Sequence, residues 1–95
     1  MTDPIIPHRE EIEQAILSLA GARGPEASIC PSEVARALAP QDWRRLLGAV
    51  RRQAAGLAAA GRIDILRKGK PVAPAELRGV IRLRIRPDAP GTSAA

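Results

Sequence analysis

The chain has 95 residues, enough for one compact domain core but not for two. Trp43 is the only aromatic residue, which disfavours base stacking on aromatic side chains and leaves duplex as the nucleic-acid candidate. The net charge of +5 is unevenly spread, because residues 1–42 hold three Arg against seven acids, a net −4, and residues 43–86 hold ten Arg and two Lys against two acids, a net +10.

The two ends of the chain lack the periodicity of packed elements. We expect residues 1–6 to be a flexible N-terminus, residues 7–86 to form the domain, and residues 87–95, which are polar and rich in Pro and Ala, to be a disordered tail. No stretch has the pattern of a secretion signal or the roughly 20 apolar residues of a membrane span, so we expect a cytoplasmic protein that does not bind membranes.

Three helices are expected in the first two thirds of the chain. The first starts at residue 7, has apolar residues three and four apart, and stops between Gly21 and Pro25. A very short strand at residues 28–29 precedes a second helix over residues 31–39, with Pro31 and Glu33 in its first turn. After a tight turn at Pro40, the third helix covers residues 41–60.

The third helix has the clearest apolar stripe in the chain. Its members recur at helical spacing and are Trp43, Leu46, Leu47, Val50, Ala54 and Leu57. At the head of this stripe, Trp43 is expected to be the largest residue of the core rather than a recognition residue. The opposite side of the helix carries four arginines.

Two segments alternate with period two and predict a pair of strands, residues 62–68 and 80–86. The connection over residues 69–79 is too long for a tight hairpin turn, so we expect a projecting loop. Helix, short strand, helix, helix and a two-stranded wing is the order of a winged helix. The sequence therefore predicts an α+β winged-helix fold of three helices and a small antiparallel sheet.

The chain also resembles a known family over roughly residues 8–86. The resemblance lies in CPSEVARAL at residues 30–38, the Trp43–Arg44 pair, and the segments RKG at 67–69 and RGVIRLR at 78–84. It is similar to an uncharacterised bacterial family of short winged-helix-like proteins, a domain of unknown function. This resemblance implies a fold and no site residues.

The placement of the basic residues suggests a binding surface. In DNA-binding winged helices the third helix enters the major groove and the wing reaches the neighbouring backbone or minor groove. The residues of this chain that match such a surface are Arg44, Arg45, Arg51 and Arg52 on the helix and Lys68, Lys70 and Arg78 at the wing. A GC-rich coding sequence also yields many arginines, so their position counts for more than their number.

Two further sets of residues have a structural explanation that we prefer. Arg82, Arg84 and Arg86 are expected on the solvent face of an edge hairpin, where charge prevents edge-to-edge pairing. Gly48 lies among the helix arginines, where it could let a surface approach the backbone, but we prefer to explain it as a neutral result of a coding bias toward glycine.

We expect a non-enzymatic duplex-DNA-binding module, a transcription regulator or accessory factor. The alternative is a protein-docking or dimerisation module of the same fold, in which the basic helix binds an acidic partner or the first helix pairs two copies. A reactive Cys30 at a helix N-terminus and a membrane-surface role for the third helix are minor alternatives.

Overall fold

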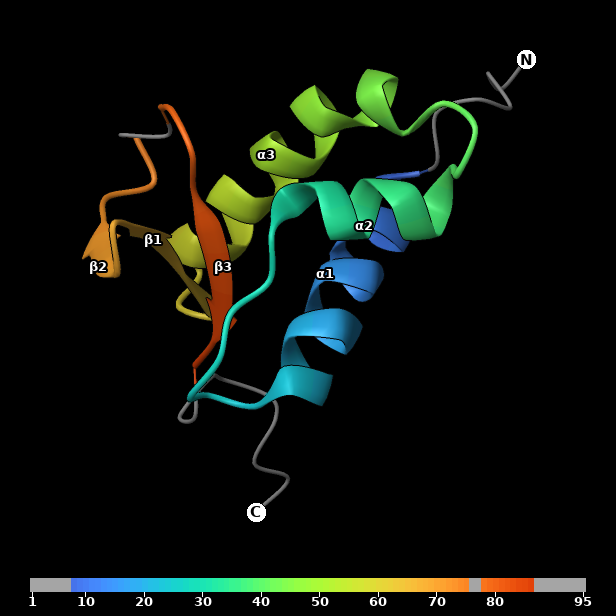
Figure 1. The fold of residues 1–95 in the computed structure, drawn as a ribbon. Helices are drawn as coiled ribbons and strands as arrows, with labels where there is room; N and C mark the ends of the chain where they lie inside the picture. The colour runs from blue at the N-terminus through green and yellow to red at the C-terminus, as the bar shows by residue number, and fades with distance from the viewer. Residues whose placement is uncertain (1–7, 76–77, 87–95) are drawn as a thin grey trace.

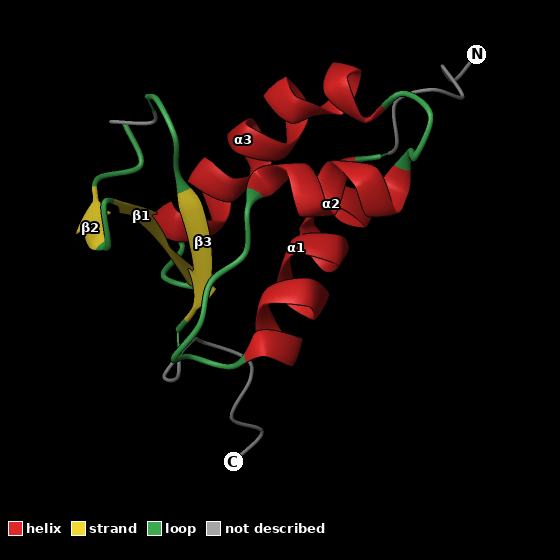
Figure 2. Ribbon diagram, viewed as in Figure 1, coloured by secondary structure: helices red, strands yellow, loops and turns green. Residues whose placement is uncertain are grey.

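The computed structural model describes residues 8–75 and 78–86 (Figure 1). The expected flexible ends, residues 1–6 and 87–95, lie outside this part. The described chain forms three helices and a three-stranded antiparallel sheet, an α+β arrangement with the element order of a winged helix. Figure 2 shows the helices gathered on one side of the molecule and the strands on the other. The predicted fold class is confirmed.

Each of the first two helices has an acidic residue in its first turn, and the carboxylate of that residue accepts a hydrogen bond from the backbone N–H just before the helix. In α1 (Arg9–Arg23), the Glu11 carboxylate accepts a hydrogen bond from the His8 N–H at 3.0 Å. In α2 (Pro31–Leu38), the carboxylate of Glu33 accepts the N–H of Cys30 at 3.0 Å. Each carboxylate satisfies an N–H that the helix leaves unpaired and favours the positive end of the helix dipole.

The ends of α1 and α3 depend on glycines with positive φ. Gly21 lies inside α1, and the helix ends at Gly24, whose φ of 81° suits glycine. The third helix, α3 (Trp43–Ala59), is followed by Gly61 at φ 79°, and the Arg62 N–H reaches back to the Leu57 carbonyl at 2.9 Å. Residues 41–42, expected in the helix, belong to the turn before it.

The sheet contains a strand, β2, that the sequence did not predict. The order is β2 (Lys70–Val72), β1 (Ile63–Arg67), β3 (Arg82–Ile85), with Ile65 opposite both Val72 and Leu83. The short strand expected at residues 28–29 is a single bridge between Ile29 and Leu83.

The expectation that residues 69–79 lack a tight turn is wrong. Arg67 pairs with Lys70, which leaves Lys68 and Gly69 as a two-residue turn, with φ of 55° and 81°. Two residues with positive φ match the right-handed twist of the flanking strands, so a short hairpin forms before the chain returns to β3. The turn was not predicted because the expectation rested on the total length of the connection, and the turn begins at Lys68, before that connection.

One hydrophobic core joins the helices to the sheet. Ile16 of α1, Val34 of α2, Val50 of α3 and Leu83 of β3 are fully buried in it. Trp43 is only partly buried and packs at the edge of this cluster, so the expectation that it is the largest core residue is wrong. Among the described helices, none is long and apolar enough to cross a bilayer.

Candidate nucleic-acid interface

The outward face of α3 carries two rows of arginines. Arg44 and Arg51 form one row and Arg45 and Arg52 the other, because residues seven apart lie two turns along the same side of a helix. Arg44, Arg45 and Arg52 are exposed, and Arg51 is partly buried. The sequence-predicted helix residues are therefore brought together on one surface.

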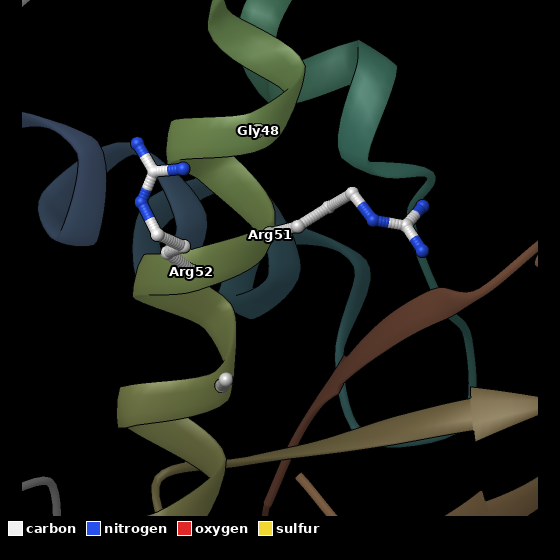
Figure 3. Close-up of a pocket in the computed structure, with 4 residues that line it drawn as sticks. Gly48, Arg51 and Arg52 are labelled. Atoms are coloured by element: carbon white, nitrogen blue, oxygen red, sulfur yellow. The ribbon is translucent and has the colours of Figure 1, made fainter. Parts of the chain in front are cut away.

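Small residues separate the two rows. Gly48 and Ala55 lie between them, and with Arg51 and Arg52 they line a shallow hollow of about 310 Å³. Figure 3 shows the side chains of Arg51 and Arg52 extending to opposite sides of α3. The helix backbone at Gly48 is left open to an approaching molecule, with cationic side chains on both flanks.

Arg51 differs from the other three helix arginines because it also holds the wing. Its guanidinium donates a hydrogen bond to the Gly79 carbonyl at 3.2 Å, and Arg67 of β1 donates to the Arg78 carbonyl at 3.4 Å. These two contacts fix the segment before β3 against α3 and the sheet. Arg51 thus has a structural role that the sequence did not reveal.

The three predicted wing residues lie at two different places in the structure, two at the β1–β2 turn and one before β3. Lys68 lies in the tight turn between β1 and β2, Lys70 begins β2 at the open edge of the sheet, and both are exposed. Arg78 is exposed at the other end of the connection, next to the glycine that bonds Arg51. The Arg78 carbonyl is bonded by Arg67 of β1, and it is the neighbouring Gly79 that bonds Arg51 of α3.

Arg82 and Arg84 of β3, and Arg86 directly after it, have partners within the fold, and their expected role against edge-to-edge pairing stays a prediction. Arg82 donates to the Ser28 hydroxyl and carbonyl at 2.7 and 2.9 Å. Asp64 accepts a hydrogen bond from Arg84 at 2.8 Å and lies 3.7 Å from the guanidinium of Arg86. These contacts join β3 to β1 and to the segment before α2.

Sequence reasoning missed one basic residue near this surface. Arg36, in the last turn of α2, has its guanidinium carbon 4.4 Å from the centroid of the Trp43 ring, and Arg44 is 4.6 Å from the same centroid. The turn between α2 and α3 brings these residues together. No regular spacing marks such a contact, so only the folded structure identifies Arg36.

Cys30 is packed in the way of a structural residue. Its thiol is partly buried and accepts a hydrogen bond from the Ser32 hydroxyl at 3.1 Å. Over residues 8–75 and 78–86, no three His, Cys, Asp or Glu side chains are grouped as metal ligands would be.

Comparison with known proteins places the chain in a family. No curated protein matches the sequence. The profile of a family described as "Protein of unknown function (DUF3253)" matches residues 9–86, which includes every helix and strand described above. The matched range agrees with the span of the resemblance noted in the sequence. The chain therefore belongs to DUF3253, a family of proteins of unknown function.

Proposed function

We propose that the chain binds duplex DNA and catalyses no reaction, as a transcription regulator or accessory factor in the cytoplasm of a bacterium. The observation that supports this most is the double row of arginines on α3, which flanks a helix surface made of Gly48 and Ala55. Guanidinium groups bind phosphate oxygens and guanine edges in two-pronged geometry, and a helix of this size fits the major groove.

The charges of Arg44, Arg45 and Arg52 are not neutralised by ion pairs within the described residues. The arginines that do form ion pairs there are Arg23, Arg82, Arg84 and Arg86. A surface with unneutralised cations gains free energy when a polyanion binds, because condensed counterions are released from the DNA. In this proposal the exposed wing residues Lys68, Lys70 and Arg78 make further contacts to the duplex.

Binding of a labelled duplex followed by fluorescence anisotropy tests the proposal. Random and GC-rich duplexes are titrated with the full chain over a series of salt concentrations. If six to eight phosphates are contacted, log Kd against log salt has a slope of about 5 to 7. Absence of binding at about 50 mM salt and about 100 µM protein contradicts the proposal, since non-specific DNA binders reach that range.

Docking of a protein partner is the second candidate function, and one observation favours it. Val80 is 84% exposed and is the large exposed hydrophobic residue of the described chain. It borders a mainly apolar hollow of about 200 Å³ between the start of α2, α3 and the segment before β3. Sedimentation of the chain and of Val80→Ser tests self-association: a dimer that the substitution dissociates, together with no DNA binding, favours docking.

A further inference from the structure

We propose that Arg36 and Arg44, stacked on the indole ring of Trp43, bind the phosphodiester backbone of duplex DNA at the turn between α2 and α3. The inference deepens the proposed function and rests on it. It adds Arg36 and Trp43 to the interface, neither of which belongs to the residues predicted from the sequence. It also extends the basic surface of α3 beyond the helix to the end of α2.

The geometry of the stack orients the two guanidinium groups. Their central carbons lie 4.4 and 4.6 Å from the centroid of one indole ring, within the range of a cation–π contact. A guanidinium that stacks on a ring keeps the N–H donors along its edge free, and these donors match the spacing of phosphate oxygens. The ring thus restricts the conformations of two flexible side chains before binding, so that less side-chain entropy is lost when a phosphate binds.

No ion pair among the described residues neutralises the two stacked arginines. Neither Arg36 nor Arg44 takes part in the ion pairs of residues 8–75 and 78–86, and the neighbouring Arg45 is exposed. The first turn of α3 contains no acidic residue, whereas the first turns of α1 and α2 do. Three like charges near the positive end of a helix dipole repel one another, and a bound phosphate relieves that repulsion.

One acidic residue opposes this arrangement and makes the proposal testable. Asp42 lines a hollow of about 240 Å³ together with Gln41, Trp43, Arg44 and Arg45. Its side chain is exposed and makes no capping hydrogen bond to α3, so replacing it leaves the helix start intact. Its carboxylate repels a phosphate at this place, and Asp42→Asn is therefore expected to tighten DNA binding.

A purely structural stack would behave differently. A cation–π contact at an exposed site stabilises a fold modestly and has no effect on the number of phosphates bound. The salt dependence of DNA binding separates the two cases, because its slope counts phosphate contacts. The emission of Trp43 gives a second readout, since the chain has no tyrosine and no other tryptophan.

The experiment compares wild type, Arg36→Gln, Asp42→Asn and the control Ser18→Glu. The control lowers the net charge by one unit, as Arg36→Gln does, but at an exposed position of α1. We expect Arg36→Gln to lower the salt slope by about 1 and the affinity at 0.1 M salt about eightfold, the counterion release of one contact. We expect Asp42→Asn to raise the affinity, Ser18→Glu to leave the slope unchanged, and Trp43 emission to change on titration with unlabelled duplex.

The outcomes distinguish the inference from the proposed function. If wild type binds DNA but Arg36→Gln has the slope of wild type and Trp43 emission stays constant, the stack is structural and the inference is wrong while DNA binding stands. If wild type fails to bind duplex at all, both are wrong. Binding of a phosphorylated peptide in place of DNA, lost in Arg36→Gln, would assign the stack to a protein partner and overturn the inference.

Discussion

The arginines at β3 and those on α3 differ in their partners: those at β3 bond other parts of the fold, whereas the exposed ones on α3 form no ion pair within the described residues. Arg84 and Arg86 share the carboxylate of Asp64, and Arg82 bonds Ser28, so the strand arginines hold the sheet to its neighbours. Arg45 and Arg52 of α3 are exposed and have no part in the ion pairs of the described chain. The charge at β3 holds the sheet to its neighbours, whereas Arg45 and Arg52 lie exposed on α3, where we propose that they bind DNA.

The largest expected effect comes from neutralising the exposed helix arginines. In Arg45→Gln/Arg52→Gln, loss of two phosphate contacts lowers DNA affinity about 60-fold at 0.1 M salt and the salt slope by about 2. Stability stays within about 0.5 kcal/mol of wild type, because neither side chain is packed. Anisotropy titrations and urea unfolding measure the two quantities.

A matched control removes the same charge from another face. Gln14→Glu/Ser18→Glu lowers the net charge by two units at exposed positions of α1. Equal loss of affinity in this control would show that net charge, and not the α3 surface, governs binding. Arg51 is unsuitable for this test because it holds the Gly79 carbonyl.

Lys68 is the next test, because its backbone conformation disfavours lysine. Its φ of 55° lies in the left-handed region, where Asn or Gly is preferred in a two-residue hairpin turn. Lys68→Asn is expected to stabilise the fold by about 0.5 kcal/mol and to lower DNA affinity about eightfold at 0.1 M salt. Stability and affinity that fall together would show instead that the lysine supports the turn.

On the strand side, Asp64→Asn is expected to have the opposite profile. The substitution removes the carboxylate that Arg84 and Arg86 share, which costs about 1 kcal/mol of stability. DNA affinity is retained, since Asp64 belongs to the sheet and not to the basic face of α3. Urea unfolding and anisotropy titration again separate the two effects, and a large loss of affinity without a loss of stability would contradict the comparison.

The local periodicity of the sequence predicted most of the fold, but it did not predict the contacts between segments that are distant in the sequence. The three helices and the β1–β3 pair follow from apolar spacing, because the same core face recurs along each element. The β1–β2 turn was missed because Lys68 is an unusual residue for positive φ. The Trp43 ring lies at the edge of the core with arginines from two elements stacked on it, an arrangement that no spacing within one helix encodes.

The candidate surface was predictable to a similar degree. Helical spacing placed four arginines on one side of α3, as the structure has them. It could not show that Arg51 is tied to Gly79 or that Arg36 approaches from α2, because both contacts depend on tertiary packing. The structure thus makes Arg45 and Arg52 better targets for substitution than Arg51, which bonds Gly79.

Gly48 offers the smallest and most specific test of the helix surface. A Cβ built at this position meets only the Arg52 Nη1 atom, at an ordinary contact distance of 3.5 Å, so the protein itself does not require glycine there. Gly48→Ala is therefore expected to stabilise α3 by up to about 1 kcal/mol, as alanine does in an exposed helix interior. DNA affinity within about twofold of wild type would assign binding to the arginine side chains, in line with the counterion argument. A loss of affinity despite higher stability would show that the duplex contacts the helix backbone at Gly48, between the two arginine rows.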